Sequence, residues 1–181
     1  MHDVEGMVEL MGGAKNFIQR LDSNFVGKHY RHDNEPGHHY IYLYDWVGAY
    51  SKTQALAREN FRKNYTADPA YGINGNDDCG QMSAWYLFTA MGFYPVAPAS
   101  GEYAFGAPQF SNITVYLDSS KTKQLEIVAH GFSEKNLYVK KVTVNGVLQK
   151  SPFLKHDQIK NGGRVEYWMT DKASSTFTMH E

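Results

Sequence analysis

The sequence contains one cysteine, Cys79, in 181 residues. A single thiol cannot form a disulfide within the chain, so a packed core must stabilise the fold. No apolar run approaches the ~20 residues that a membrane-spanning helix needs, and we expect no membrane span. The opening residues, MHDVEGMVELMGG, also lack the basic start and apolar stretch of a signal peptide. These absences leave the compartment open.

The sequence also lacks an excess of charge of either sign. It has 18 Lys and Arg against 19 Asp and Glu, a net charge of -1, and the basic residues are scattered. Nucleic acid and anionic lipid bind clustered positive charge, so we expect no nucleic acid partner. What the chain does contain is 42% hydrophobic and 14% aromatic residues. That is enough for a substantial core and for rings that stack on sugars.

The first half of the chain has the periodicity of helices. Apolar residues recur at helical spacing from Val4 to Met11 and again from Phe17 to Leu21, with a break at Gly12 and Gly13. A second helix is predicted over 51–64 with Ser51 as its N-cap, and a third over 81–91, where Gly92 ends it. The third is apolar on most sides, which indicates a buried helix.

The second half has the pattern of short strands separated by turns. Strands are predicted over 112–117, 124–130, 137–145 and 164–169. The Asn145-Gly146 pair is typical of a two-residue hairpin turn, so we expect hairpins and no crossovers. Helices followed by strands predict an α+β fold, with a helical part over 1–98 and an antiparallel β part over 99–181.

Two polar clusters lie in loops rich in aromatic residues and glycine, where binding residues are often found. The second cluster, GINGNDDCGQMSAWY, places Asn76, Asp77 and Asp78 just before a predicted helix. One of them could serve as the helix cap. Two consecutive aspartates need a further explanation, because their charges repel. Base catalysis or binding of a hard cation such as calcium would provide one.

The first cluster, DNEPGHHYIYLYDW, places Asn34 and Glu35 before Pro36 and then His38 and His39. Proline stiffens this turn, which carries oxygen and imidazole groups together. Zinc is disfavoured, because no histidine pair has the helical spacing of a zinc site and no cysteine is close in sequence.

Three segments in order, NEPGHHYIYLYDW, KTQALAREN and GNDDCGQMSAWYLFTAMGFYPVAP, resemble the C-terminal catalytic region of family 92 α-mannosidases. The resemblance extends to HDVEGMVELMGGAKNFIQRLDSNF at the start and YAFGAPQF later, so it covers nearly the whole chain. It implies that 1–98 form a portion of an (α/α)6 toroid and that 99–181 form a sandwich-like β part. It also implies calcium-assisted, inverting removal of terminal α-linked mannose.

The resemblance also implies roles for the residues of both clusters. Asp78 would be the general base with Asp77 assisting, although Asn76 stands where many members have an acid, which leaves the choice of base open. Asn34 and Glu35 would help to hold calcium. The other polar residues of the two loops would bind the sugar: His38, His39, Asn76 and Gln81.

The family's general acid is a glutamate in a motif upstream of the stretch that resembles HDVEG, and neither Glu5 nor Glu9 matches that motif. We therefore expect a fragment that lacks the acid, is nearly inactive alone, and has two partners: a mannose-containing glycan and the missing N-terminal part. The parent would be secreted, periplasmic or surface-associated in a bacterium, with a cytoplasmic location not excluded. Two alternatives stay open: a non-catalytic carbohydrate- or calcium-binding module, and a purely structural piece.

Overall fold

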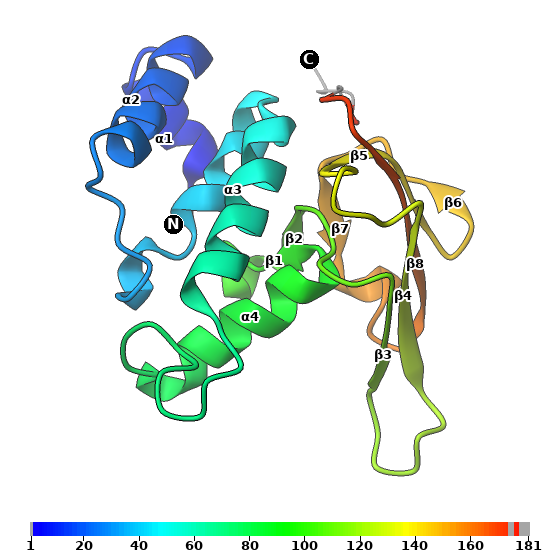
Figure 1. The fold of residues 1–181 in the computed structure, drawn as a ribbon. Helices are drawn as coiled ribbons and strands as arrows, with labels where there is room; N and C mark the ends of the chain where they lie inside the picture. Colours follow the sequence, from blue (N-terminus) through cyan, green and yellow to red (C-terminus); the bar gives the residue numbers. More distant parts are fainter. Residues whose placement is uncertain (1, 174–175, 178–181) are drawn as a thin grey trace.

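The computed structural model describes residues 2–173, 176 and 177 and confirms the α+β fold. Helices occupy the first half of the chain and pack beside the sheets of the second half (Figure 1). Among the described residues, no helix combines the length and the apolar character needed to cross a membrane.

The predicted helices are present, with small shifts at their ends. The two predicted to flank Gly12 and Gly13 are separate helices, and both glycines have positive φ. Ser51 is not the cap of its helix, because α3 begins at Tyr50 and Ala49 takes the N-cap position. The described residues form four α-helices: α1 (Val4–Leu10), α2 (Ala14–Val26), α3 (Tyr50–Asn64) and α4 (Gln81–Met91).

A further helical segment, the 3-10 helix η2 (Tyr40–Val47), lies at the centre of the helical core. Six of its eight residues are buried: Ile41, Tyr42, Leu43, Tyr44, Asp45 and Val47. Its neighbours in the core include Phe17 of α2, Ala57 of α3 and Trp85 of α4. The sequence motif that resembles a catalytic loop therefore also contributes much of the core that fixes that loop.

The strands form two sheets. A three-stranded sheet has the order β1-β2-β7, and a five-stranded sheet has the order β3-β4-β8-β5-β6. The Asn145-Gly146 turn joins β5 to β6 with positive φ at both residues, as predicted. The strands are β1 (Phe93–Tyr94), β2 (Glu102–Phe105), β3 (Asn112–Tyr116), β4 (Gln124–His130), β5 (Tyr138–Val144), β6 (Val147–Leu148), β7 (Phe153–Lys155) and β8 (Gly163–Thr170).

The expectation of hairpins without crossovers is wrong at one place. β8 lies between β4 and β5 and pairs with β4 in parallel, with Leu125 opposite Gly163. The chain leaves β4, builds β5, β6 and β7, and then returns to the centre of the sheet. Alternation in β8, where Val165, Tyr167 and Met169 are buried, defines its inner face but not its partner.

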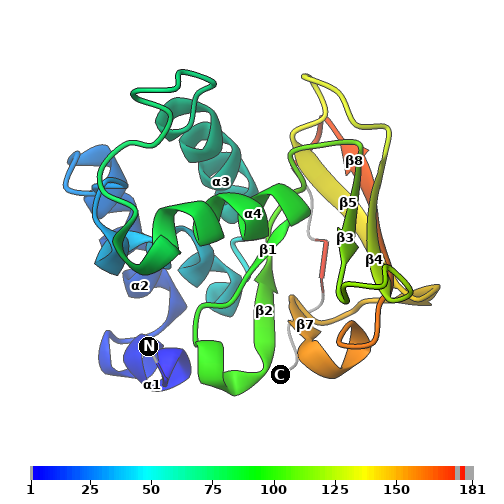
Figure 2. The ribbon, with the colours of Figure 1, turned by 90° about the horizontal axis from the view of Figure 1, so that it is seen from below.

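The helical and β parts share contacts across the predicted boundary at 98. Strand β1 lies before that boundary and pairs with β2 after it. Tyr50 of α3 is part of the core that the sheets enclose. Arg58 of α3 donates to the carbonyl oxygens of Ser133 and Asn136 at 3.4 and 3.2 Å. Figure 2 shows α4 and β1–β2 between the two parts, so the helical loops sit on a scaffold braced by strands.

Gly92 closes α4 in a left-handed conformation with φ of 88°. A Cβ at this position would lie 2.8 Å from the Pro108 nitrogen and 3.0 Å from Tyr167 Cζ. We expect Gly92→Ala to lower the free energy of unfolding by more than about 1 kcal/mol, measured by denaturant titration. Gly101→Ala is the control, because Gly101 also has positive φ but its Cβ would meet nothing within 4 Å. Equal losses in both variants would show that the predicted clash does not exist.

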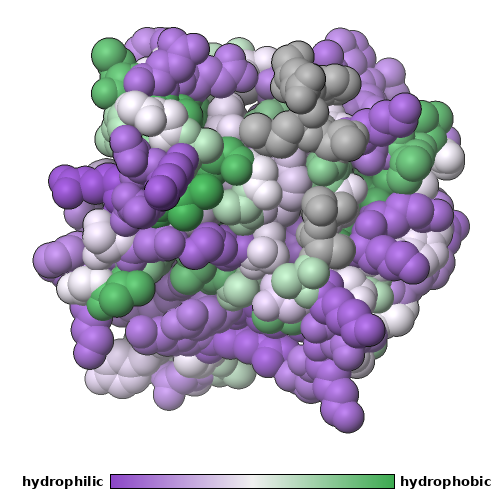
Figure 3. Space-filling model, turned by 90° about the horizontal axis from the view of Figure 1, so that it is seen from above, coloured by the Kyte–Doolittle hydropathy of each residue, from purple (hydrophilic) through white to green (hydrophobic). Residues whose placement is uncertain are grey.

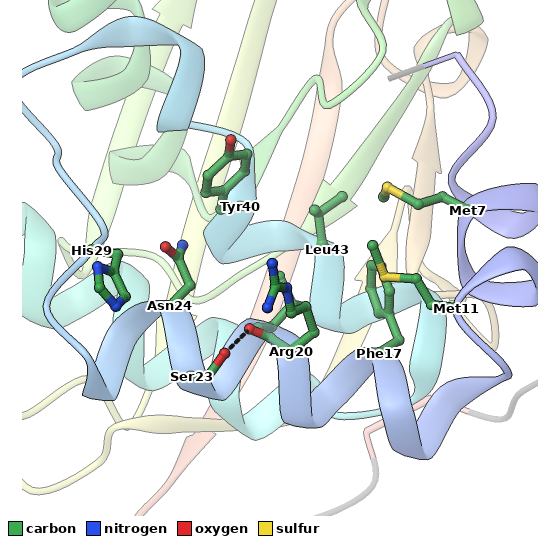
Figure 4. A pocket seen from close by; sticks show the side chains of 10 residues that line it. Met7, Met11, Phe17, Arg20, Ser23, Asn24, His29, Tyr40 and Leu43 are labelled. Carbon is green, nitrogen blue, oxygen red and sulfur yellow. Dashed lines mark hydrogen bonds between the residues drawn. The ribbon is translucent and has the colours of Figure 1, made fainter.

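The helical part carries an apolar groove between α1, α2 and η2. Its volume is about 470 Å³, and Met7, Met11, Phe17 and Leu43 form its apolar lining (Figure 4). Leu10 and Val26 nearby in sequence are 92% and 82% exposed. Figure 3 shows hydrophobic patches on an otherwise mostly hydrophilic face. Burial of such side chains on another surface would be favourable.

Candidate active-site loops

The two polar clusters predicted from the sequence lie against each other. A Cβ added to Gly75 would be 2.6 Å from the Asp33 carbonyl oxygen and 3.0 Å from Asp33 Cα, so the two backbones are in direct contact. Asp33 is held in turn by Arg31, whose Nε and Nη2 donate to its two carboxylate oxygens at 3.0 and 2.6 Å. The loop containing Asp77 and Asp78 therefore approaches the turn containing Asn34 and Glu35.

Asp77 caps the first turn of α4. Its Oδ1 accepts from the Ser83 backbone N–H at 2.9 Å and its Oδ2 accepts from the Ser83 hydroxyl at 2.7 Å. These bonds, the backbone one first, lower the pKa of the Asp77 carboxyl. Both oxygens of Asp77 are thus occupied in holding the loop to the helix.

Asp78 is the other carboxylate of the pair, and it is differently placed. It is exposed and opens a short 3-10 turn, Asp78–Gly80, and no described residue donates a hydrogen bond to its carboxylate. The next residue, Cys79, has φ of 54°, a conformation that non-glycine residues rarely adopt. The loop therefore presents one engaged and one available carboxylate.

His38 is not positioned to touch a sugar directly. His38 is only 1% exposed, and its Nε2 donates to the His32 carbonyl oxygen at 2.9 Å. Nδ1 lies 3.4 Å from Gln81 Nε2. Burial lowers the pKa of His38. The structure thus joins His38 to Gln81, two residues predicted to bind substrate, but removes His38 from direct reach.

His39, Asn76 and Gln81 remain accessible for contact with a ligand. Asn76 is exposed, and Gln81 and His39 are partly buried. Burial lowers the pKa of His39 to about 4, so its ring is neutral near pH 7 and can donate and accept hydrogen bonds.

Comparison with known proteins identifies the family. The family model described as the glycosyl hydrolase family 92 catalytic domain matches residues 1–171. The chain belongs to glycosyl hydrolase family 92.

Solved structures of family 92 mannosidases resemble this family 92 chain. BT3965 from Bacteroides thetaiotaomicron is 42% identical over 88% of this chain with a TM-score of 0.82. The inverting mannosidase BT2199 from the same organism is 37% identical over 94% of this chain, also with a TM-score of 0.82. A structure of BT3965 in complex with mannoimidazole covers the same share of this chain.

A curated relative is an uncharacterized secreted glycosidase from Arthroderma benhamiae, 28% identical over 96% of this chain. The family 92 chain spans only 22% of that protein, 22% of BT3965 and 26% of BT2199. The matched region is therefore about a quarter of each relative.

Two residues of this family 92 chain fit part of a calcium site. Asn34 is exposed, and Glu35 has a carboxylate oxygen, Oε1, that is inaccessible to solvent and has no hydrogen-bond partner. Such an oxygen suits a hard cation, which takes about six to eight oxygen ligands. Within the described residues no group of three or more His, Cys, Asp or Glu could hold a metal. Asn34 and Glu35 thus fit as two ligands of a larger set.

A buried histidine beneath the loops was not assigned a role from the sequence. His32 is 4% exposed, and its Nδ1 and Nε2 lie 2.8 and 2.9 Å from the hydroxyls of Tyr30 and Tyr65. Burial lowers its pKa to about 3. Its ring stacks on His38 at 4.6 Å between centroids. The aromatic-rich sequence around His32 is a signal for packing, but it does not predict the partner Tyr65, which lies 33 residues further along the chain.

Proposed function

We propose that the longer protein containing this segment removes terminal α-linked mannose from glycans by inverting hydrolysis. This segment would supply the base and part of a calcium site, and the general acid would come from another part of the longer chain. The available carboxylate of Asp78 beside the engaged Asp77 carries the proposal. The identity of about 40% to mannosidases supports the substrate class, since BT3965 is described as an α-mannosidase and BT2199 as an inverting mannosidase.

Inversion requires a base on the face of the sugar opposite the leaving group, with the acid and base carboxyls about 6.5 to 9.5 Å apart. In this scheme Asp78 accepts a proton from water as the water oxygen bonds to the anomeric carbon. The bond from that carbon to the leaving oxygen breaks, and the acid protonates the leaving oxygen. Asp77 assists by anchoring the loop to Ser83, so that Asp78 is held in one place.

Two carboxyls of this segment, Asp77 and Asp45, are unsuited to act as the general acid, which supports its proposed origin elsewhere. A general acid needs a raised pKa to stay protonated near neutral pH. The pKa of Asp77 is lowered. The pKa of Asp45 is raised well above its usual value by burial, yet Asp45 is completely enclosed in the core and bonded to Thr53. Neither Asp77 nor Asp45 can therefore protonate a leaving group at the loops.

Calcium, when bound, would polarise and orient sugar hydroxyls, which favours the distorted ring of an oxocarbenium-like transition state. Asn34 and Glu35 would contribute oxygen ligands, and the tight contact of Gly75 with Asp33 would keep that turn beside Asp78. We propose that the parent is exported, as the description of the secreted Arthroderma benhamiae relative supports.

The stereochemistry of the product tests the proposed function. We expect the longer protein to release β-mannose first from an α-mannoside, with α-mannose appearing later by mutarotation, as followed by proton NMR of the anomeric region. An α-product formed first would contradict inversion. Mannose binding without hydrolysis would favour the alternative, a non-catalytic carbohydrate- or calcium-binding module.

A further inference from the structure

We propose that His38 is a positioning residue for Gln81: its ring orients the Gln81 amide so that the carbonyl oxygen, and not the amino group, is offered to the sugar. Gln81 is the first residue of α4 and follows Asp78 by one short turn. The inference rests on the proposed function, because it assigns a role within the same site.

The hydrogen-bond partners of His38 fix which nitrogen carries the proton. The main-chain carbonyl of His32 can only accept, so Nε2 of His38 must donate in the 2.9 Å contact. At 1% exposure the ring is withdrawn from water, which disfavours a charged imidazole. A neutral ring with its proton on Nε2 leaves Nδ1 as an acceptor. His38 therefore presents a lone pair, and not a proton, to Gln81.

That lone pair determines the orientation of the Gln81 amide. Gln81 Nε2 donates to His38 Nδ1 at 3.4 Å and to the Tyr94 hydroxyl at 2.7 Å. The reversed amide would place its oxygen against the Nδ1 lone pair, which is repulsive. Both amide protons are thus used inside the protein. The carbonyl oxygen, on the opposite side of the amide, receives no hydrogen bond from any described residue and remains an acceptor for a sugar hydroxyl.

A rigid surround keeps the His38 ring from turning. Trp85 Nε1 donates to the His38 carbonyl oxygen at 3.2 Å, and the His32 ring stacks on the His38 ring. His32 is itself fixed, since the Tyr65 hydroxyl donates to the Met82 carbonyl at 3.0 Å and must accept from His32 Nε2. These bonds connect the residues on both sides of η1 (Glu35–Gly37) to the N-terminal half of α4.

A double-mutant cycle in the longer protein tests this role. We expect H38F to raise KM for an α-mannoside about tenfold with a much smaller effect on kcat, since one neutral hydrogen bond to substrate becomes unreliable. Q81M removes that bond outright and should raise KM to a similar extent. The double variant H38F/Q81M should have the KM of Q81M, because His38 acts only through Gln81.

Thr53→Val is the stability control, because it removes a buried hydrogen bond from Thr53 to Asp45 in the core. It should lower the melting temperature and leave KM unchanged. If H38F does not fold, H38N enters the same cycle. If the wild type is active and the increase in KM of the double variant equals the product of the increases in the two single variants, the positioning role of His38 is overturned and the proposed function is not. A wild type that binds but does not hydrolyse would overturn the proposed function, and the same cycle on mannose affinity would then decide the role of His38.

Discussion

Replacing Asp78 with asparagine is expected to lower kcat of the longer protein for an α-mannoside by about 10²- to 10⁴-fold, the usual contribution of a general base. The amide keeps the size of the side chain but cannot accept a proton from water. The carboxylate of Asp78 forms no hydrogen bond with the described residues, so its replacement removes none of the bonds that hold the loop. Steady-state kinetics with a saturating α-mannoside would measure the loss.

Asp77→Asn is the matched control for Asp78→Asn. Asparagine is also a good cap and can still accept from the Ser83 backbone N–H. We therefore expect most of kcat to remain, with lower thermal stability as the main effect. The reverse result, an inactive Asp77→Asn and an active Asp78→Asn, would exchange the roles of the two aspartates.

The elements of this fold could largely be predicted from local pattern, whereas the pairing of its strands could not. Strand β4 (Gln124–His130) has the predicted bounds, and the Asn145-Gly146 turn has the predicted geometry. Periodicity reports which side chains face the core, but it does not report that β8 pairs with β4 in parallel. Local pattern also missed η2, whose residues are apolar on nearly all sides and so show no clear period.

The approach of the two loops could be predicted only through the family resemblance. The roles of the individual loop residues could be predicted only in part. Capping was one of the readings for the three residues before α4, and Asp77 takes that role. The accessibility of the loop residues could not be predicted from the sequence. His38 is enclosed by the nearby His32 ring and by Trp85, which lies 47 residues away in the chain. Burial by such long-range packing leaves no signature in the neighbouring residues.

Removal of calcium is expected to abolish mannoside turnover by the longer protein, and calcium added back should restore it. This expectation can be tested at one side chain, Glu35. Its Oε1 is shielded from water without any hydrogen-bond partner, a costly arrangement for a carboxylate unless a cation or donor reaches it. Activity after treatment with a chelator, with metal analysis to confirm removal, would measure the requirement.

Glu35→Gln should raise the calcium concentration needed for half-maximal activity by about tenfold or more, because the affinity of oxygen-based sites depends on ligand charge. Glu134→Gln removes a carboxylate that is exposed and paired with Arg62, away from the loops, and should leave the calcium requirement unchanged. Full activity in the metal-free protein would exclude calcium from the reaction. An equal calcium requirement in Glu35→Gln and in the unmodified protein would instead place the ion on other ligands.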